Sequence, residues 1–356
     1  MSAPALMPPV CLSRSGYKTA ASFPALFLIQ HFPAYSFLRN IFYVLRQIKE
    51  KYIKLFAGQL NSPSICYNHL KQRKGQVSQP MIQDIFPHRF DNHFKPGIFP
   101  QDDDTVFCFS KDGVLCLLKE NSVCFPKVSD CTFSDIPIYL SELDGSPLFL
   151  SLSIPDKIPE GFSYMPLRRL RKKDTPDKAL IFAAITAGHL YSWYSSCRFC
   201  GSCGAPLVPS GTERAMVCLS CKKVFYPRIN PAVIVGVTDH DNLLLTKYAG
   251  RNMPFYALVA GFTEIGETFE ETAAREVMEE TGLEVENIRY YKSQPWGFAD
   301  DILAGFFCDV KGSAAIRMDT GELKEAVWMP RREIPGQPDD FSLTNEMMMA
   351  FKRGLI

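Results

Sequence analysis

The sequence predicts an α/β protein with strand-rich domains and a small cysteine-bearing segment between them. Short runs of β-branched, aromatic and aliphatic residues alternate with turn-rich pieces after residue 81. One strongly patterned helical segment, residues 269–281, interrupts the strands of the C-terminal part. Two Cys-x-x-Cys pairs lie between the two strand-rich regions. Together these observations predict at least two α/β domains joined by a metal-stabilised ribbon.

Composition and charge narrow the class of protein. The chain has 356 residues, 46% hydrophobic and 22% charged, which excludes disordered and fibrous proteins. Its net charge of +1 conceals an asymmetry, because residues 1–83 carry +9 and the remainder carries −8. An acidic body repels phosphate backbones and disfavours a general nucleic-acid-binding protein.

Residues 1–80 show no alternation of strands and turns. Apolar residues at helical spacing in 41–60, with Lys and Arg between them, are typical of a mitochondrial presequence or a membrane-surface helix. The alternative, which we favour, is a poorly ordered extension outside the working protein. No secretory signal is evident, and the apolar stretch 23–38 is broken by prolines and polar residues. We therefore expect a cytoplasmic protein without a membrane partner, or a mitochondrial matrix protein if the leader is a genuine presequence.

The rest of the chain divides into three predicted parts. Residues 81–178 form a small mixed domain with strands at 105–110, 114–118 and 148–153. Residues 179–229 contain a helix, at 179–194, and the cysteine segment. Residues 230–356 form the second α/β domain, with the helix at 269–281 and strands at 232–238, 243–248, 256–261, 288–293, 302–310 and 326–329.

Four of the twelve cysteines have the spacing of a structural zinc site. Each Cys-x-x-Cys turn directs two thiolates to one point, and Gly204 after the first pair relieves its tight turn. Four sulfur ligands leave no open position for catalysis, so we expect one structural Zn²⁺. Cys197 offers a competing pairing with Cys200, but the turn before Gly204 is the better knuckle. The predicted ligands are Cys200, Cys203, Cys218 and Cys221.

The helix at 269–281 carries its own boundary signals. Thr268 and Glu271 form a capping-box pattern at the start, and Gly282 is typical of a C-terminal stop.

Inside this helix three carboxylates share one face. Glu276, Glu279 and Glu280 stand at i, i+3 and i+4, where like charges destabilise a helix. Arg275 is the one nearby cation, and we expect it to point to one side. Clustered carboxylate oxygens suit Mg²⁺ or Mn²⁺, although a solvated acidic face is the alternative on the helix alone.

The spacing around these carboxylates resembles the Nudix box, G-x5-E-x7-R-E-U-x-E-E-x-G-U, at every defined position over 23 residues. The resemblance to Nudix hydrolases implies an α/β/α sandwich and hydrolysis of a nucleoside diphosphate linked to another group. It implies that Glu276, Glu279 and Glu280 bind the metal, one of them serving as general base. The other box residues, Gly261, Glu267, Arg275 and Gly282, are implied to be structural, with Arg275 orienting Glu267.

Two flanking features narrow the resemblance. The cysteine segment and Ser293-Gln-Pro-Trp296 together resemble the NADH pyrophosphatase (NAD⁺ diphosphatase) subfamily, whose marker reads S-Q-P-W-x-F-P-x-S. The resemblance covers most of 81–353 and places a typical family start at Met81, so 1–80 is upstream sequence or an added extension. It implies a homodimer, and two further metal ligands, Glu322 and the Ala260 carbonyl. The implied substrate contacts are Arg168, Glu213, Tyr226, Gln294, Pro295, Trp296, Gly297, Phe298, Ala299, Asp300 and Asp301.

Trp296 and Phe298 of the marker can stack on a nicotinamide or adenine ring, and Tyr226 can do the same, whereas core packing is their alternative role. The chain has Ala299 and Asp301 where the marker has Pro and Ser, and we expect Gly297 and Ala299 to loosen this loop.

The sequence therefore predicts metal-dependent hydrolysis of NADH or NAD⁺ to AMP and nicotinamide mononucleotide. One alternative is removal of NAD caps from RNA 5′ ends. Another is an inactive NAD-sensing or nucleic-acid-binding zinc-ribbon protein, which the intact box disfavours.

Overall fold

The computed structural model describes residues 81–120, 122–171, 177–250, 254–338 and 341–356. The amphipathic segment expected at 41–60 lies outside these residues. The chain divides into two units, 1–76 and 77–356, and the description below concerns the second. Among the described residues, no helix has the length and apolarity needed to cross a bilayer.

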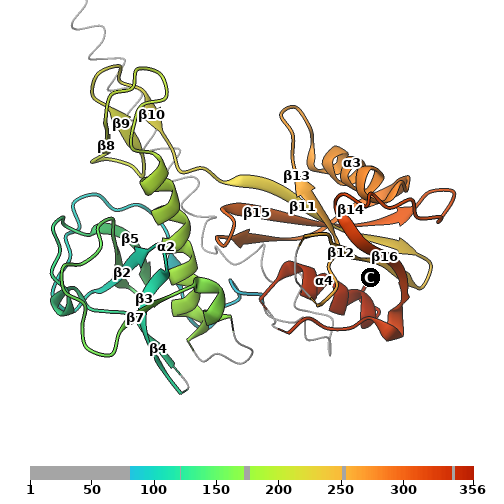
Figure 1. Ribbon diagram of the computed structural model, residues 1–356, viewed down its shortest axis with the longest axis horizontal. Helices are drawn as coiled ribbons and strands as arrows, with labels where there is room; N and C mark the ends of the chain where they lie inside the picture. Colours follow the sequence, from blue (N-terminus) through green and yellow to red (C-terminus); the bar gives the residue numbers. More distant parts are fainter. Residues whose placement is uncertain (1–80, 121, 172–176, 251–253, 339–340) are drawn as a thin grey trace, which may run out of the picture. The chain divides into compact units, whose positions relative to one another are not determined.

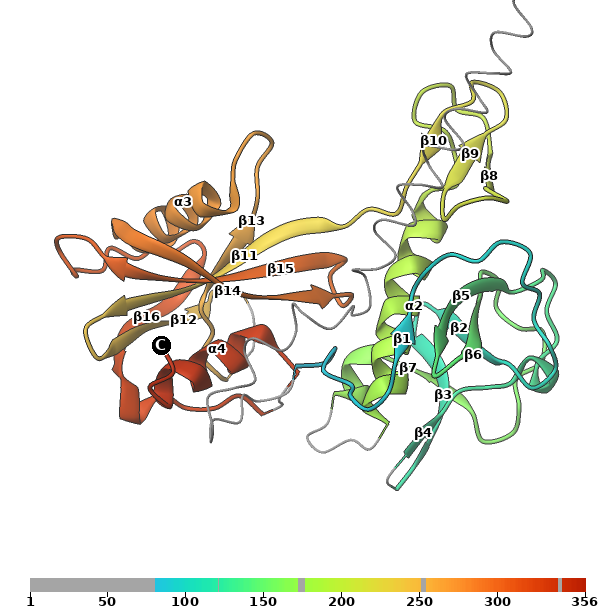
Figure 2. The same ribbon diagram turned by 180° about the vertical axis from the view of Figure 1, so that it is seen from behind.

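The first domain is built on a seven-stranded sheet of order β1-β5-β6-β2-β3-β4, with β7 paired to β3. Helix α2 (Lys178–Ser196) packs on this sheet (Figure 2), and its Ile181 and Ala184 share a buried cluster with Phe107 and Leu150. The helix assigned by sequence to the cysteine segment thus completes the core of the first domain. The strands are β1 (Phe90–Asp91), β2 (Thr105–Ser110), β3 (Gly113–Lys119), β4 (Ser122–Cys124), β5 (Ile138–Leu143), β6 (Ser146–Ser151) and β7 (Ser163–Met165). Two 3-10 helices, η1 (Val128–Asp130) and η2 (Leu167–Leu170), lie in its connections.

A small three-stranded sheet of order β10-β9-β8 follows directly from the end of α2 (Figure 1). Its strands are β8 (Leu207–Pro209), β9 (Met216–Cys218) and β10 (Val224–Phe225). Arg214 ties this ribbon to the first domain by donating to the carbonyls of Leu140 and Asn92, at 2.5 and 3.2 Å.

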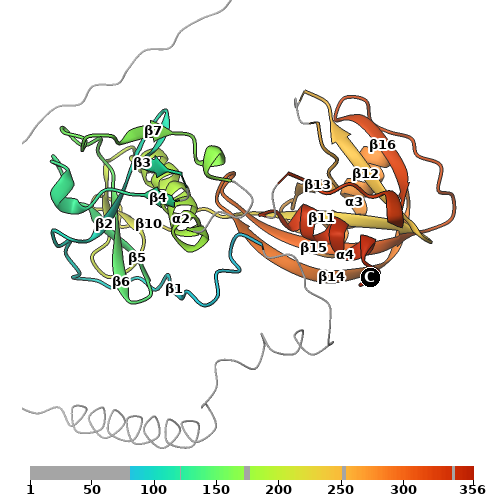
Figure 3. The same ribbon diagram turned by 90° about the horizontal axis from the view of Figure 1, so that it is seen from below.

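The second α/β domain has a six-stranded sheet of order β14-β15-β11-β12-β16, with β13 paired to β11. Strands β11 and β15 are parallel, and the other pairs are antiparallel. Helices α3 and α4 cover opposite faces of this sheet (Figures 1 and 3). The elements are β11 (Asn230–Asp239), β12 (Asn242–Tyr248), β13 (Val259–Phe262), α3 (Phe269–Thr281), β14 (Val285–Trp296), β15 (Asp301–Val310), β16 (Leu323–Pro330), η3 (Arg331–Glu333) and α4 (Leu343–Lys352).

The pattern of β11 explains this layering. Side chains alternate between the faces of a strand, so Ala232 and Ile234 join the cluster under α4 while Val233 and Val235 join the cluster under α3. A strand buried on both faces reads as a continuous apolar run, as Ala232–Val237 does. The predicted α/β/α sandwich is confirmed.

Helix α3 has the predicted boundaries at both ends, whereas α4 is absent from the sequence prediction. A tertiary network holds α4 to the sheet: Glu346, 1% exposed, accepts hydrogen bonds from Tyr291 and Lys292 of β14. Strand β13 begins at Val259, later than the predicted 256.

Candidate active site and zinc ribbon

The loop and helix that carry the carboxylates are fixed by local hydrogen bonds. The Thr268 hydroxyl accepts from the Glu271 N–H at 3.2 Å, and the Glu271 carboxylate accepts from the Thr268 N–H at 2.8 Å. This is the predicted capping box. Gly282 ends α3 in the left-handed conformation, φ 66°, and donates to the Met278 carbonyl. The helix is therefore closed at both ends by residues of the motif.

Arg275 is the centre of the site's electrostatics. Its guanidinium forms a bidentate pair with Glu267, at 2.6 and 2.9 Å, and also donates to the Phe262 carbonyl of β13 at 3.0 Å. The hydrogen bonds from Arg275, with one from the Glu264 N–H, lower the pKa of Glu267 to about 2, so Glu267 is ionised. These contacts pin the loop before α3 to the helix.

The expectation that Arg275 points to one side is wrong. Its Nη1 also donates to Glu276 at 2.8 Å and to Glu279 at 2.9 Å. Anchored by Glu267 and the strand carbonyl, the guanidinium reaches across the start of the carboxylate face. It thereby offsets the like-charge repulsion that would otherwise destabilise α3.

Glu276 lies against the backbone of β13. A Cβ on Gly261 would fall 1.9 Å from the Glu276 carboxyl carbon, so the glycine is required by this close approach. The Glu276 side chain is 12% exposed. Burial raises its pKa, and the charges of Glu279 and Glu322 add to that rise. The site thus places a carboxylate where a bound cation would favour its ionised form.

The other predicted magnesium or manganese ligands differ in their exposure to solvent. Glu280 is 2% exposed, whereas the Glu279 side chain is 60% exposed. Glu322 is exposed in the turn before β16, and Ala260 pairs with Ile234 in the sheet. Among the described residues, the four cysteine sulfurs form the one set of three or more Cys, His, Asp or Glu ligand atoms that lies close enough to hold a metal ion, within 4.8 Å of one another. The carboxylate oxygens of the Nudix box are farther apart than these sulfurs. The donor chemistry nevertheless fits a hard divalent cation, because oxygen ligands of clustered negative charge suit Mg²⁺ or Mn²⁺.

The four predicted zinc cysteines converge, with all sulfurs within 4.8 Å of one another. The Cys200–Cys221 and Cys203–Cys218 sulfurs are 3.5 Å apart. Tetrahedral Zn–S bonds of about 2.3 Å place sulfurs about 3.8 Å apart, so the set fits zinc. Cys197 is not in this set; it caps the end of α2.

Both zinc knuckles use the same backbone turn. Gly204 and Lys222, which each follow the second cysteine of a pair, have φ of 72° and 62°. Gly204 donates to the Cys200 carbonyl and Lys222 to the Cys218 carbonyl, each at 2.9 Å. A backbone N–H from Ser202 contributes most to lowering the pKa of Cys200 to about 6, which favours the thiolate that a metal binds.

In the Ser-Gln-Pro-Trp stretch at the end of β14, Gln294 has a structural position. It is 0% exposed; its amide N–H₂ donates to the backbone carbonyl of Phe341 and to the side-chain Oε1 of Gln83, and its oxygen accepts from the Leu343 N–H at 2.7 Å. Both polar atoms of the Gln294 side chain bond the protein in this structure, and its contact with substrate stays a prediction. Gln294 joins β14 to the start of α4.

The aromatic pair of this loop is arranged edge to face. The Trp296 and Phe298 ring centroids are 4.9 Å apart, and the Arg171 guanidinium lies 4.9 Å from the Trp296 centroid. A nucleobase that stacks on this face of Trp296 must therefore take the place of Arg171. The expectation that Gly297 loosens the loop is wrong: a Cβ there would lie 2.8 Å from the Ile185 carbonyl oxygen of α2, so the glycine permits tight packing.

The two acidic residues that end the loop differ in environment. Asp300 lies 3.8 Å from His189. Asp301 is 7% exposed, and its Oδ1 is buried without a hydrogen-bond partner. Burial raises the pKa of Asp301 to about 6. Pro295 and Ala299, the remaining loop residues predicted to contact substrate, are exposed.

The other predicted substrate contacts lie in the first domain and the ribbon. Arg168 is exposed on η2. Glu213 and Tyr226 are exposed on the ribbon, with the Tyr226 hydroxyl 3.4 Å from the Glu213 carboxylate.

The sequence prediction missed two features near these sites. Arg171 lies over the Trp296 ring, and no local pattern in the sequence signals this contact. Glu325 binds Lys247 at 2.6 Å and Tyr256 at 2.5 Å, a cluster that strand pairing of β12 with β16 assembles.

Comparison with known proteins supports both parts of this description. Residues 228–350 match the NUDIX domain family, and residues 195–226 match the NADH pyrophosphatase zinc ribbon domain. The NAD-capped RNA hydrolase NudC of Citrobacter koseri is 35% identical over 201 residues, 56% of this chain and 75% of that protein. Its namesake from Salmonella paratyphi C is 40% identical over 46% of this chain, which spans 63% of that relative's length. A Nudix hydrolase structure from Nitrosomonas europaea is 22% identical and has a TM-score of 0.38, covering 44% of this chain and 91% of its own.

The matched box, the four converging cysteines and these relatives give one conclusion: the chain belongs to the NADH pyrophosphatase (NudC) family of Nudix hydrolases.

Proposed function

We propose that the chain hydrolyses the pyrophosphate bond of NADH or NAD⁺, giving AMP and the reduced or oxidised nicotinamide mononucleotide. The observation that carries this proposal is the Gly261–Glu276 contact, which holds a largely buried carboxylate against β13 within the complete Nudix box. Glu276, Glu279 and Glu280, with Glu322 and the Ala260 carbonyl, are the residues that would hold Mg²⁺ or Mn²⁺. Such an ion, when bound, neutralises charge on the phosphoryl oxygens and lowers the pKa of a water molecule.

The residues of this chain position the reacting groups and form no covalent bond with the substrate. Arg275 holds Glu276 and Glu279 in a fixed geometry from one end of the carboxylate face. One of the three glutamates serves as general base toward the attacking water. Glu267 takes no part in proton transfer, because Arg275 keeps it ionised and occupied.

The relatives' name suggests a second substrate of the same chemistry, the NAD cap of RNA. An inactive NAD-sensing or nucleic-acid-binding protein is the remaining alternative. We also propose a homodimer, on the family resemblance, and a cytoplasmic location.

The decisive experiment incubates the purified, zinc-loaded protein with NADH and either Mg²⁺ or Mn²⁺ and separates the products. We expect AMP from the wild type, none after the divalent ion is removed by a chelator, and a loss of at least about 100-fold in Glu280→Gln. The matched control is Glu270→Gln, an exposed carboxylate in the first turn of the same helix. Wild-type protein that releases no AMP would exclude the enzyme, and equal turnover by Glu280→Gln would exclude the metal-site assignment.

Parallel reactions with NAD⁺ and with NAD-capped RNA rank the substrates by kcat/KM. A higher kcat/KM for the capped RNA would identify the capped RNA, in place of the free dinucleotide, as the main substrate. Analytical ultracentrifugation of the same preparation tests the homodimer.

A further inference from the structure

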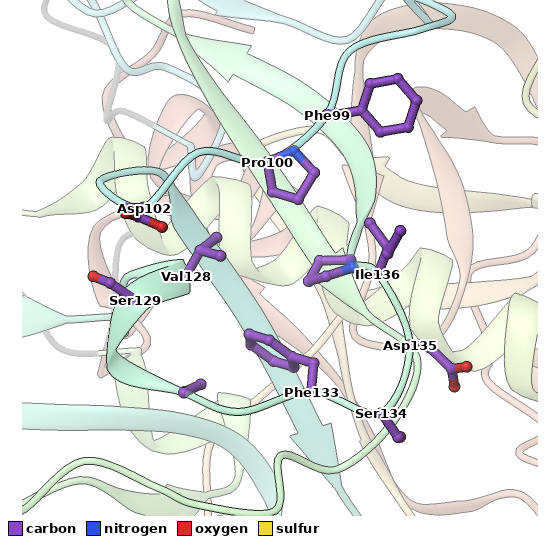
Figure 4. A pocket seen from close by; sticks show the side chains of 11 residues that line it. Phe99, Pro100, Asp102, Val128, Ser129, Phe133, Ser134, Asp135 and Ile136 are labelled. Carbon is purple, nitrogen blue, oxygen red and sulfur yellow. The ribbon is translucent and has the colours of Figure 1, made fainter.

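The first domain has an open hollow of about 540 Å³ that belongs to neither the zinc ribbon nor the Nudix box. It is lined by the loop before β2 and by the connection between β4 and β5. Figure 4 shows Pro100, Val128 and Phe133 of this hollow, with the carboxylates of Asp102 and Asp135 at opposite sides. The lining residues lie outside both matched family ranges, so neither family assigns them a role.

Hydrogen bonds hold the two segments of the hollow together. The Asp104 carboxylate accepts from the Gln101 N–H at 2.8 Å, and the Asp104 carbonyl accepts from the Val128 N–H at 3.0 Å. The Asp102 carbonyl accepts from the Ser129 N–H at 3.1 Å. Val128 also packs against a buried apolar cluster of the first domain. The hollow is therefore formed before any ligand arrives, and binding there needs little ordering of the chain.

Large apolar side chains are exposed at and around the hollow. Phe99 is 66% exposed and Ile136 is 69% exposed, and both line it. Ile154 and Ile158 are exposed on a neighbouring segment, which donates a backbone hydrogen bond to the Thr132 carbonyl. The exposed apolar surface thus extends beyond the hollow, which is typical of a protein-binding surface rather than of a site for a small molecule.

The charge of this surface indicates the kind of partner. Residues 99–104 and 125–137 contain five Asp and, in Lys127, one cation, a net charge of −4. Asp102 and Asp135 are exposed, and no hydrogen bond or ion pair joins their carboxylates to another described residue. Such a surface attracts cations and repels the phosphates of nucleic acids and dinucleotides. A second copy of this chain would bring further negative charge, because the chain after residue 83 carries −8.

We propose that the hollow binds a partner protein through a segment in which a large apolar side chain lies between basic residues. The apolar side chain occupies the hollow beside Phe99 and Phe133, and a Lys or Arg on each side of it pairs with Asp102 or Asp135. The apolar contact supplies the affinity, and the two carboxylates select a basic segment. The proposal is independent of the hydrolase activity, because no residue of the Nudix box takes part.

The test selects random peptides displayed on phage against the full-length, zinc-loaded protein. Phages that bind a variant carrying Phe99→Ser, Asp102→Asn and Asp135→Asn are removed first, so the recovered peptides are those that need the hollow. We expect these peptides to have a net positive charge, with a large apolar residue between Lys or Arg residues.

Titration of one recovered peptide, followed by fluorescence anisotropy, measures each contact. Phe99→Ser should weaken binding at least about tenfold, because it removes apolar contact area at the hollow. Asp102→Asn combined with Asp135→Asn should weaken binding about fivefold at low salt and less at high salt. The matched control is Asp112→Asn, an exposed carboxylate in the turn between β2 and β3, which should leave the affinity unchanged. All the replaced side chains are exposed, and circular dichroism verifies the fold of each variant.

Three results would overturn the proposal. A selection that leaves no peptide would show that the hollow does not bind a peptide segment. Recovered peptides that are acidic or uncharged would show that the carboxylates do not select the partner. Equal affinity of the recovered peptide for the wild type and for Phe99→Ser would show that the apolar contact does not form.

Discussion

Replacing Asp301 with Asn is expected to stabilise the protein, and more so at high pH than at low pH. Asp301 is 7% exposed with one carboxylate oxygen unpaired, and burial raises its pKa from 3.8 to about 6. Its folded-state pKa is raised, so the folded protein binds the proton more tightly than the unfolded chain. Stability therefore falls as pH rises from about 4 to about 6 and then stays lower. At about 1.4 kcal/mol per pKa unit, the ionised carboxylate costs about 3 kcal/mol at pH 8 and about 1 kcal/mol at pH 4.5.

The assay is urea unfolding of wild type and Asp301→Asn at both pH values, with the change in stability taken from the midpoint shift and the m-value. Asn keeps the shape of the side chain and removes the charge. Asp300→Asn is the control: Asp300 is half-buried, next in sequence, and lies near the His189 ring, so its effect should be much smaller. A gain that is equal at pH 4.5 and pH 8, or a loss at pH 8, would refute the argument that Asp301 is ionised against its burial.

Two further substitutions test the supports of the site. Gly261→Ala places a methyl group against the Glu276 carboxyl, so the kcat for NADH hydrolysis should fall about 100-fold with a small change in Tm. The control Gly211→Ala, which adds a methyl group with no atom nearby, should have no effect. An unchanged kcat in Gly261→Ala would contradict the close approach of Glu276 to Gly261. Gln294→Leu leaves the Leu343 N–H and the Phe341 carbonyl without their partner. Urea unfolding should therefore show that the free energy of unfolding falls by about 3 kcal/mol, against a negligible change in Ser293→Ala. A fall below about 1 kcal/mol would show that Gln294 does not hold α4.

Local patterns in this chain predicted the parts of the fold that local physics determines. The boundaries of α3 follow from Thr268 and Gly282, each of which acts within one turn. The four zinc cysteines follow from two short spacings. Helix α4 was missed, although Ser342 as N-cap and the apolar spacing of Leu343, Met347 and Phe351 are the signals that would have indicated it.

Local sequence patterns could not predict the contacts between segments that are far apart in the chain. One of the four acceptors of Arg275 is the Phe262 carbonyl, which lies 13 residues earlier and reaches the helix only because β13 pairs with β11. The structural role of Gln294 had no local signal, because its partners Gln83 and Phe341 are 211 and 47 residues away. A marker motif identifies residues that the fold needs in one place, and it does not separate those that touch substrate from those that hold the loop.

The chain differs from the family marker at Ala299 and Asp301, and these differences do not give a looser loop. Gly297 is held against α2, so the loop has no added freedom from its glycine. The departure changes the charge at the end of the loop instead, because Asp301 is a buried carboxylate whose pKa is raised by burial to about 6. Outside the marker, the Arg171 guanidinium lies 4.9 Å from the Trp296 ring centroid, so a substrate ring that stacks there must displace a cation. Selectivity among dinucleotides in this chain should therefore respond to substitution of Arg171 and Asp301 more than to substitution of Ala299.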